Sequence, residues 1–466
     1  MKRGDIEFLF EGRSLTAREG DTVAAALFAN GVRVFGRSSK YHRPRGYRCG
    51  QGHCSACAMR VDGLPGARTC VTPVRAGMTV EREHAWPPAG VDVLRAAELL
   101  SPLMPPGFYY RWFRSSPRLF DVFERRLASV AGQGRLPGRE AADRLAVARC
   151  ERRDHTAVLV VGGGAAGLSA ALAAADAGAG VLLVEQDDRL GGRLADPPGR
   201  QPASELVAQA LAHDRIEVLT DSEAIGWYEE GVVAIDRRPH LLLVRPAAVV
   251  LATGGYDLGL PFAGWDLPGV MLATGALRLL RRYGVKPGSR AVVLTVDDRG
   301  YGVARDLAAG GVGLACVADC RPPQAIRQEL RDEATALGTS LVAGAEGAKA
   351  QGFARLSGLS LRVSQDGDRK TVRHDCDLVC VWAGVRPADD LAYQAVSRGS
   401  LLLSAGEVLG VVGDNGSADV AGEALTVRPW LAGLVAGACD ADLAIEQGTA
   451  AGSAAARHAR AAADPA

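Results

Sequence analysis

The sequence has little net charge and no long apolar run free of polar interruptions. Its 54 lysines and arginines nearly balance its 53 aspartates and glutamates, which leaves a formal net charge of +1. This balance gives no global attraction to nucleic acid or anionic lipid, so neither is expected as a partner. The most apolar stretch, residues 157–184, is broken by many glycines and by Asp176, which argues against a membrane span.

The first residues also lack the apolar segment of a secretory signal peptide. The opening text, MKRGDIEFLFEGRSL, has acids and a glycine where such a peptide is apolar. We therefore expect a cytoplasmic protein whose thiols are kept reduced. The sequence shows no serine–histidine–acid arrangement typical of a nucleophilic hydrolase. It also identifies no catalytic residue.

Cysteines are few but clustered: 10 occur in 466 residues, and four of them lie between residues 49 and 70. A disulfide scaffold spreads its cysteines through a small chain, so this clustering indicates metal or cluster ligation. Cys49, Cys54 and Cys57 have the spacing C-x4-C-x2-C, with Cys70 as a fourth, which matches the opening of plant-type 2Fe-2S loops. The alternatives are structural zinc, whose sites usually pair two separate knuckles, and unliganded thiols.

We expect different roles for two glycines near the clustered cysteines and for the remaining cysteines. Gly50 and Gly52 would let the loop wrap a cluster closely and aim backbone N–H groups at its sulfurs. The other cysteines lie in or beside apolar strands and helices, where we expect small core residues. They are Cys150, Cys316, Cys320, Cys376, Cys380 and Cys439.

A basic segment, GRSSKYHRPRGYR, precedes the four cysteines. Its charged or titratable residues are Arg37, Lys40, His42, Arg43, Arg45 and Arg48. One interpretation is a solvated loop that offsets the charge of a negative cluster. The other is a contact with phosphate or with a partner, because arginine forks suit bidentate phosphate binding.

The order of patterns predicts two to four domains. We expect a 2Fe-2S ferredoxin-like domain at residues 1–88, a small mixed sheet with one helix near residues 21–30. A helical connector should follow at 89–150. Strands alternating with alanine-rich helices predict an FAD- or NAD-binding domain at 151–275 and 386–466, with a second dinucleotide-type domain inserted at 276–385.

The text AVLVVGGGAAGLSAALAAADAGAGVLLVEQ predicts a strand, a glycine-rich turn, a helix, a second strand and an acid. Gly162 would make the turn, Gly164 would let a pyrophosphate approach the backbone, and Gly167 would permit close helix–sheet packing. The helix N-terminus favours the anion, and Glu185 would hold ribose hydroxyls. FAD is the expected ligand, and NAD is the alternative.

Three further segments, RLGGRL, VVLATGG and VAGAC, resemble flavin-contact segments of two-dinucleotide flavoproteins. The expected cofactor-binding residues are Gly162, Gly164, Ala165, Ala166, Gly167, Glu185, Gln186, Gly191, Gly192, Arg193, Leu194, Ala252, Thr253, Gly254 and Gly437.

The second dinucleotide unit has a weaker signature, DDRGYGVARDLAAGG. Asp297 and Asp298 stand where phosphates would approach, and two carboxylates there would repel a pyrophosphate. Gly300 and Gly302 could still form a turn, and Asp319 follows the next strand. We expect this unit to have a structural role.

The text GDTVAAALFANGVRVFGRSSKYHRPRG, followed by the connector and the double dinucleotide unit, resembles the amino-terminal half of the alpha subunit of heterotetrameric sarcosine oxidase. It is also similar to the large subunits of bacterial proline, hydroxyproline and opine dehydrogenases and hydrogen cyanide synthase. The resemblance covers nearly the whole chain, and residues 36–46 are its most specific part. It implies an α/β protein in which a β-grasp ferredoxin-like domain is joined to a two-dinucleotide-binding flavoprotein fold of Rossmann type.

The resemblance further implies an electron-transfer subunit of a flavin-dependent amine or imino-acid dehydrogenase or oxidase. An FAD-containing beta subunit would oxidise the amine. Further small subunits, and an FMN at the subunit junction, are compatible with the resemblance. This sequence keeps the four cysteines, and the folate-binding domain of sarcosine oxidase alpha subunits has no counterpart in it. Both features favour a dehydrogenase. The aromatic and arginine-rich residues 108–123 would contact a partner or pack on the chain's own sheet.

Two other functions are compatible with the sequence. One is a self-contained NADH:acceptor oxidoreductase with its own iron–sulfur centre, and the other is a scaffold with vestigial cofactor sites. The weak second fingerprint favours the electron-transfer subunit over the first alternative. The intact cysteines count against the second.

Overall fold

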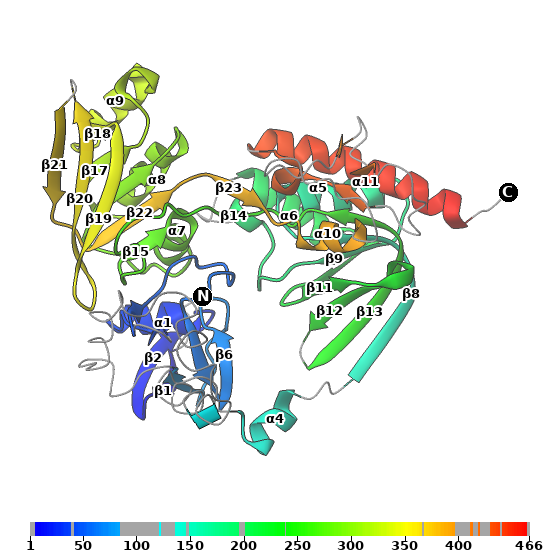
Figure 1. The fold of residues 1–466 in the computed structure, drawn as a ribbon. Helices are drawn as coiled ribbons and strands as arrows, with labels where there is room; N and C mark the ends of the chain where they lie inside the picture. Colours follow the sequence, from blue (N-terminus) through cyan, green and yellow to red (C-terminus); the bar gives the residue numbers. More distant parts are fainter. Residues whose placement is uncertain are drawn as a thin grey trace. The chain divides into compact units, whose positions relative to one another are not determined.

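The structure, a computed structural model, divides by its contacts into two compact units (Figure 1). One unit comprises Met1–Arg144 and Asp257–Gly384, and the other comprises Leu145–Tyr256 and Val385–Ala466. The described residues are 5–38, 42–83, 121–122, 136–145, 149–194, 201–237, 239–365, 368–396, 411–412, 418–419, 429–438 and 440–463. Most of the predicted connector, including nearly all of residues 108–123, lies outside them, and the predicted domain boundaries stay predictions.

The first part of unit 1 is a five-stranded mixed sheet with the order β2-β1-β7-β5-β6. β1 pairs antiparallel with β2 and parallel with β7, an arrangement of the β-grasp type. Helix α1 is buried along most of its length, and the Thr22 side chain caps it by accepting from the Ala25 N–H at 3.3 Å. The helix predicted near residues 21–30 is thus confirmed. The elements are β1 (Asp5–Phe10), β2 (Arg13–Arg18), α1 (Val23–Ala29), β5 (Ala58–Val61), β6 (Leu64–Arg68) and β7 (Thr79–Arg82).

The second part of unit 1 is a parallel five-stranded sheet with the order β15-β22-β16-β17-β18, next to the antiparallel strands β19, β20 and β21. Its central strands are apolar and buried, as expected for a parallel sheet covered on both faces. The strands are β15 (Val270–Leu272), β16 (Arg290–Thr295), β17 (Gly313–Asp319), β18 (Ser340–Ala343), β19 (Ala345–Gly352), β20 (Leu356–Gln365), β21 (Asp368–His374) and β22 (Leu378–Trp382). The helices are α7 (Ala273–Arg282), α8 (Arg299–Ala309) and α9 (Gln328–Ala336).

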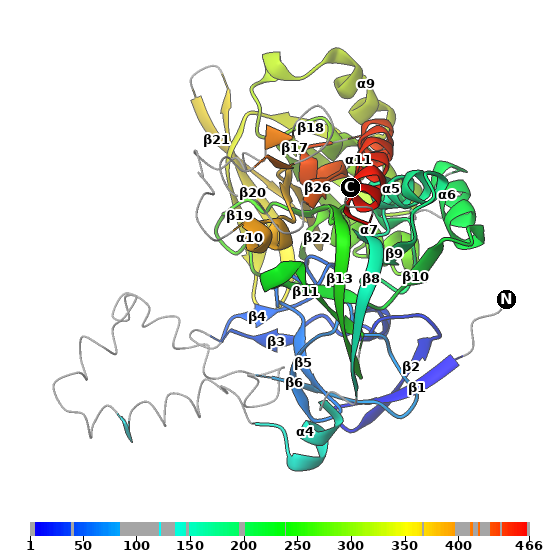
Figure 2. The same ribbon diagram turned by 90° about the vertical axis from the view of Figure 1, so that its right-hand side faces the viewer.

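Unit 2 is built on a seven-stranded sheet with the order β10-β9-β8-β13-β12-β11, in which β26 also pairs with β13. The long strands β8 and β13 run through its centre (Figure 2). The strands are β8 (Arg149–Val161), β9 (Val181–Val184), β10 (Ile216–Leu219), β11 (Glu223–Trp227), β12 (Val233–Arg237), β13 (His240–Leu251) and β26 (Pro429–Leu431). The helices are α5 (Ala165–Asp176), α6 (Gln201–Ala212), α10 (Asp390–Val396) and α11 (Ala441–Ala463).

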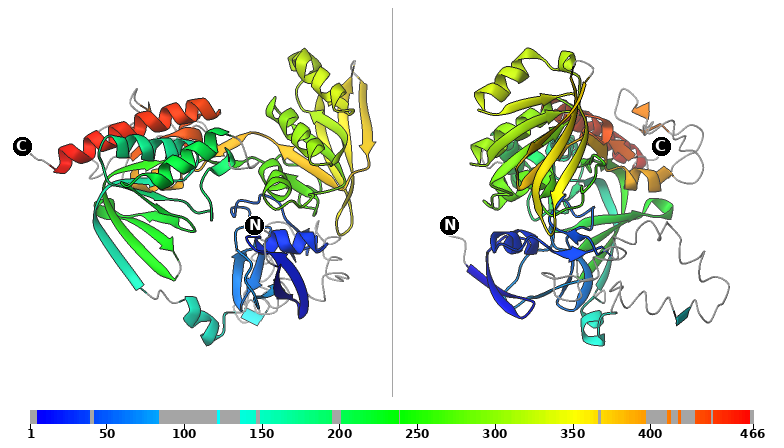
Figure 3. Two further views of the ribbon diagram at one scale, coloured as in Figure 1. Left: turned by 180° about the vertical axis from the view of Figure 1, so that it is seen from behind. Right: turned by 60° about the vertical axis from the view of Figure 1, so that its left-hand side comes forward.

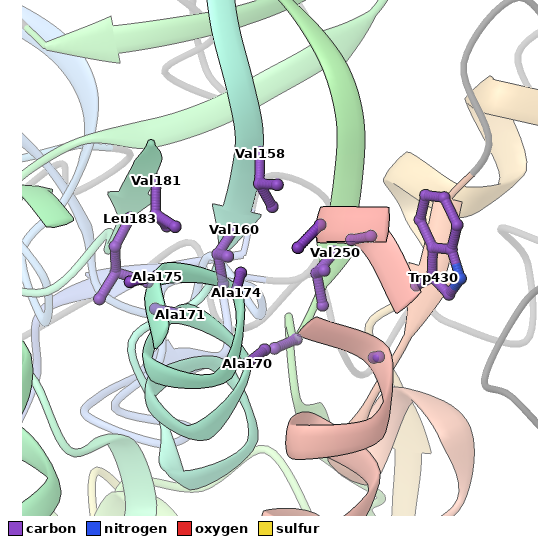
Figure 4. Close-up of a cluster of buried hydrophobic side chains, with 14 of the residues drawn as sticks. Val158, Val160, Ala170, Ala171, Ala174, Ala175, Val181, Leu183, Val250 and Trp430 are labelled. Carbon is purple, nitrogen blue, oxygen red and sulfur yellow. The ribbon is translucent and has the colours of Figure 1, made fainter. Parts of the chain in front are cut away.

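Helices α5 and α11 pack together at the apolar face of this sheet (Figure 3). Small side chains allow the approach: a Cβ added at Gly448 would lie 2.2 Å from the Ala166 carbonyl oxygen, and one at Gly452 would lie 2.1 Å from that of Ala170. Alanines of α5 contact valines of β8 and β13 in the core beneath (Figure 4). The glycines of α11 therefore set how closely it covers α5.

Short elements complete the described fold. They are β3 (Gly36–Arg37), β4 (Pro44–Arg45), α4 (Arg139–Leu145), β14 (Gly255–Asp257), β23 (Val385–Pro387), β24 (Val411–Val412), β25 (Ala418–Asp419) and the 3-10 turns Gly192–Leu194, Glu229–Gly231, Pro323–Ala325 and Gly433–Ala436. In the part of the chain that the structure describes, no helix has the length and apolar character needed to cross a membrane.

Candidate functional site

The four clustered cysteines lie in unit 1, around the loop between β4 and β5 and at the end of β6. Cys49, Cys57 and Cys70 are buried, and Cys54 is half-buried. Backbone N–H groups donate to two of the sulfurs: Gln51 to Cys49 Sγ, and Cys70 to Cys57 Sγ, both at 3.4 Å. The fold thus brings together all four predicted ligands.

The four sulfurs are within hydrogen-bonding reach of one another in a chain. A hydrogen bond with Cys54 is the main cause that holds the pKa of Cys49 well below its ordinary value, and the same bond raises the pKa of Cys54. A bond with Cys70 lowers the pKa of Cys57, while the pKa of Cys70 is raised by bonds with Cys49 and Cys57. The order of contacts is therefore Cys54, Cys49, Cys70, Cys57.

The four cysteine sulfurs gathered here are a donor set that fits a two-iron cluster. A structural zinc site needs four ligands around a single ion, whereas the four cysteines of a 2Fe-2S cluster are shared between two irons.

Two glycines give the loop its shape, and two arginines hold it. Gly50 and Gly52 have φ of +67° and +81°, in the left-handed region that side chains disfavour. The Arg278 guanidinium donates to the Gly50 carbonyl at 2.8 Å, and that of Arg68 donates to the Gly52 carbonyl at 2.7 Å. These bonds fix the backbone between Cys49 and Cys54 and place two positive charges beside the thiols.

Helix α7 forms one wall of this loop. A Cβ added at Gly275 would lie 2.2 Å from the Arg48 carbonyl oxygen, so only glycine allows the contact. The Arg48 guanidinium stacks 3.8 Å above the centre of the Trp265 ring and donates to the Trp265 carbonyl at 3.1 Å. Burial lowers the pKa of Arg48 to about 10, although nearby Cys54 and Asp266 favour its charge.

The basic segment before the cysteines is not a solvated loop throughout. Arg37 and His42 are only 4% and 2% exposed, and the Arg37 guanidinium donates to the His42 carbonyl at 2.8 Å. The solvated interpretation is wrong for these two residues because they pack within the fold. Arg45 is exposed and Arg43 is half-buried, and Lys40 lies outside the described residues.

The glycines after β8 have local geometry compatible with the roles that the sequence predicts. Gly162 has φ of +105°, and its added Cβ would lie 2.3 Å from the Ala252 carbonyl oxygen. At Gly167 the Cβ would lie 1.8 Å from the Gly162 carbonyl oxygen, so helix α5 packs tightly on the turn. At Gly164, the residue that caps α5, nothing lies within 4 Å. This open position at a helix N-terminus suits the approach of a phosphate.

Glu185 stands at the end of β9 with its carboxylate turned to the glycine turn. It is 7% exposed and accepts from the N–H groups of Gly163 at 2.6 Å and Asp187 at 2.8 Å. Its neighbour Gln186 is exposed. The acid thus lies beside the turn, as the dinucleotide pattern requires.

The other predicted residues of this site fall in three groups. Gly191 donates to the Gly163 carbonyl at 2.8 Å, and a Cβ at Gly192 would lie 3.0 Å from the Gly164 Cα, so RLGGRL borders the turn. Arg193, in the 3-10 turn with Leu194, donates to the Gly255 carbonyl at 3.0 Å. Thr253 Oγ1 donates to the Ala388 carbonyl at 2.6 Å, and the Gly254 carbonyl accepts from the Ala388 N–H at 3.0 Å.

Gly437 caps the 3-10 turn Gly433–Ala436 with φ of +84°, and nothing lies within 4 Å of its added Cβ. This turn reaches the first turn of α5, because a Cβ at Gly433 would lie 2.7 Å from the Ala166 Cβ. Ala165 and Ala166 open that helix. The structure therefore brings all four predicted segments around the N-terminus of α5.

The weak second fingerprint, in unit 1, carries an ion network. Arg321 donates to Asp298 at 2.7 Å and to buried Asp319 at 2.7 Å, and Arg327 donates to Asp298 at 2.8 Å. The Tyr301 hydroxyl also donates to Asp319 at 3.0 Å. Asp319, which follows the second strand of this unit as a ribose-binding acid would, is therefore already bonded, and the arginines lower the pKa of Asp298.

Comparison with known proteins identifies the family. Residues 3–85 match the model of a 2Fe-2S iron-sulfur cluster binding domain, and residues 157–236 match that of an FAD dependent oxidoreductase. The sarcosine oxidase alpha subunit of Rhizobium meliloti (strain 1021) is 32% identical over 372 residues, which cover 74% of this chain and 37% of that protein. The chain belongs to the sarcosine oxidase alpha subunit family.

Two further comparisons show similarity over part of the sequence and over the fold. An opine oxidase subunit of Agrobacterium tumefaciens (strain Ach5) is 29% identical over 188 residues, 36% of this chain and 37% of that protein. The chain thus spans just over a third of the length of these two curated relatives. The crystal structure of L-proline dehydrogenase from P. horikoshii has a TM-score of 0.65 at 20% identity, covering 97% of this chain and 73% of that one, and shows the same fold.

Family membership confirms the predicted fold class: a 2Fe-2S ferredoxin-like domain followed by a Rossmann-type FAD-dependent oxidoreductase fold. One expectation about the other cysteines is wrong. Cys150 is exposed, because the first residues of β8 extend past the covered part of the sheet. Cys316, Cys376 and Cys380 are buried core residues as expected, Cys320 is half-buried, and Cys439 lies outside the described residues.

Three residues beside the cysteine loop were not predicted from the sequence. Gly275 and Arg278 lie more than 200 residues after it, and no local pattern links them to it. Tyr47 is two residues before Cys49 and is almost fully buried. Its position beside a ligand was a visible signal, but burial could not be inferred from the surrounding basic text.

Proposed function

We propose that this chain is the electron-transfer subunit of a hetero-oligomeric flavin-dependent amine or imino-acid dehydrogenase or oxidase. Its substrate would be of the sarcosine, proline, hydroxyproline or opine type. The observation that carries the proposal is the convergence of four cysteine sulfurs in one buried loop of a chain from this family. When bound there, a 2Fe-2S cluster supplies one-electron transfer between a partner flavin and an acceptor.

Cys49, Cys54, Cys57 and Cys70 would hold the cluster. The N–H groups of Gln51 and Cys70 stabilise thiolate charge. Arg68 and Arg278 keep the loop backbone in place and offset the added negative charge.

In unit 2, the N-terminus of α5 would bind the pyrophosphate of FAD, with NAD as the alternative ligand. Gly164 leaves room for the phosphates, and the backbone N–H groups of Ala165 and Ala166 favour their charge. Glu185 would hold the adenosine ribose hydroxyls. The segments at Gly191, Thr253 and Gly437 would line the rest of the ligand.

Catalysis of amine oxidation is assigned to a partner. The relatives are named as subunits of sarcosine oxidase and of opine oxidase, which supports a multi-subunit assembly. In this proposal the assembly includes an FAD-containing beta subunit, with an FMN at the junction. The bonded state of Asp298 and Asp319 argues against NADH as the reductant at the second fingerprint. We place the assembly in the cytoplasm, where the four thiols stay reduced before cluster insertion.

The test is expression of this chain alone and together with the product of a neighbouring oxidoreductase gene. Sarcosine, proline, hydroxyproline and opines are assayed with an artificial dye. We expect no turnover by the chain alone and turnover of one substrate by the co-purified assembly. Equal turnover by the isolated chain would contradict the subunit proposal, and dye reduction by NADH with this chain alone would replace it with an NADH:acceptor reductase.

The bracing of the cysteine loop by α7 makes a separate prediction. Arg278→Met should speed loss of the cluster to a chelator about tenfold, because one charged hydrogen bond to the loop contributes roughly 1.5–3 kcal/mol. Decay of the visible absorbance gives the rate.

The matched control is Arg281→Met on the same helix, which removes an ion pair with Asp306 of α8. Its rate should equal that of the unmodified protein. Equal rates for both variants and the unmodified protein would show that Arg278 does not hold the loop.

A further inference from the structure

The Tyr47 hydroxyl is a buried polar group that the proposed function leaves unexplained. Tyr47 is 1% exposed, and its hydroxyl has no hydrogen-bond partner within the described part of the chain. Leaving a buried hydroxyl unpaired is destabilising, so native proteins nearly always supply a partner. The position of this hydroxyl indicates which partner is missing.

Packing aims the Tyr47 ring at the cysteine loop. Phe28 contacts it edge-on, with the ring centres 6.2 Å apart and an interplanar angle of 64°. A Cβ added at Gly50 would lie 2.5 Å from the Tyr47 hydroxyl and 2.9 Å from the Gly275 Cα. The hydroxyl therefore lies against the backbone next to Cys49, and α7 closes the other side of the loop.

This hydroxyl can act as a hydrogen-bond donor, because a tyrosine phenol, whose ordinary pKa is about 10, is protonated near neutral pH. Tyr47 lies two positions before Cys49, and its hydroxyl lies against Gly50 in the same loop. It can therefore donate a hydrogen bond to a sulfur at this site.

We propose that the Tyr47 hydroxyl donates a hydrogen bond to a sulfur of the bound cluster and thereby raises the reduction potential of the cluster. This inference rests on the proposed 2Fe-2S site. Reduction adds one negative charge to the cluster, and a donor to sulfur stabilises the reduced form more than the oxidised form. The tyrosine keeps its proton and gains or loses no electron. Tyr47 would thus set how readily the centre accepts an electron.

The experiment compares the cluster potential of the full chain with that of Tyr47→Phe, which keeps the ring and its packing. Both are purified without oxygen, their iron and sulfide are measured, and the cluster is titrated against potential by electron paramagnetic resonance. We expect a full iron content and a lower midpoint in the variant. The ratio of reduced to oxidised cluster at a fixed potential should fall about tenfold, which is 59 mV for a one-electron couple.

Tyr301→Phe is the matched control. It removes a buried tyrosine hydroxyl from the same unit, but that hydroxyl donates to Asp319 at 3.0 Å. Its midpoint should equal that of the unmodified chain. An equal shift in both variants would mean that the change follows from loosened packing, and the proposal would be wrong.

Site-specific replacement of Tyr47 by 3-fluorotyrosine provides a second measurement with the opposite expected sign. The fluorinated phenol is a stronger donor of nearly the same size, so the midpoint should rise. This measurement decides the matter if Tyr47→Phe takes up no cluster. An unchanged midpoint with 3-fluorotyrosine overturns the proposal, whereas absence of iron from the unmodified chain would instead overturn the cluster assignment on which it rests.

Discussion

A Cys54→Ser variant purified without oxygen should lose most of its iron and acid-labile sulfide, together with the visible charge-transfer bands. The unmodified chain should contain about two of each. Cys54 is half-buried, and its hydrogen bond with Cys49 places it at one end of the sulfur chain. Serine is a poorer ligand for iron, because its hydroxyl does not ionise near neutral pH whereas the metal-bound thiol does.

The control for this variant is Cys316→Ser in the same unit. Cys316 is fully buried in β17, and burial raises its pKa to about 12, as expected for a core thiol that binds nothing. Its replacement should lower stability but leave the iron content per folded chain unchanged. Stoichiometric zinc without iron in the unmodified chain would refute the cluster assignment, and so would full iron content in Cys54→Ser.

The second large effect is expected in unit 2, where one glycine variant should weaken ligand binding and another should weaken folding. Gly164→Val should leave the melting temperature close to that of the unmodified chain, because Gly164 has extended backbone angles and open space around an added Cβ. The valine side chain would, however, clash with a bound pyrophosphate. We expect at least about tenfold weaker binding, since losing 1.4 kcal/mol of phosphate contact is enough for that change.

Gly167→Ala should do the reverse. Its methyl group would lie 1.8 Å from the Gly162 carbonyl oxygen, so α5 or the turn must move and the unit should lose several kcal/mol of stability. Thermal melting and chromatography of the released ligand distinguish the two variants. Dinucleotide content that is unchanged in Gly164→Val would show that no phosphate approaches there, and release of NAD in place of FAD would correct the ligand but keep the site.

Local patterns predicted the parts of both sites that lie close together in the chain. The spacing of Cys49, Cys54 and Cys57 and the turn at Gly162 depend on neighbours a few residues apart, and the structure places them as the patterns require. The sequence also predicted helix α1 and the strand series from β8 onward. These features follow from spacing and periodicity, which need no knowledge of distant contacts.

Features that depend on distant contacts were not predictable. Arg278 donates to Gly50 across 228 positions, and nothing near either residue signals the other. Burial of Arg37 follows from tertiary packing that overrides the polar character of its segment. From the sequence alone Asp298 is an unpaired charge, whereas in the structure Arg321 donates a hydrogen bond to it.

The division of unit 2 into two separate segments has a consequence for its synthesis. When the ribosome has made Tyr256, the unit still lacks β26, which pairs with β13, and α11, whose Gly448 and Gly452 seat it on α5. At 5–20 residues per second, on the order of 10 s passes while the stretch up to Gly384 is made. During that interval the apolar face of α5 is open to chaperones or to aggregation. Unit 2 can therefore close only after the last residue of unit 1, Gly384, has been made.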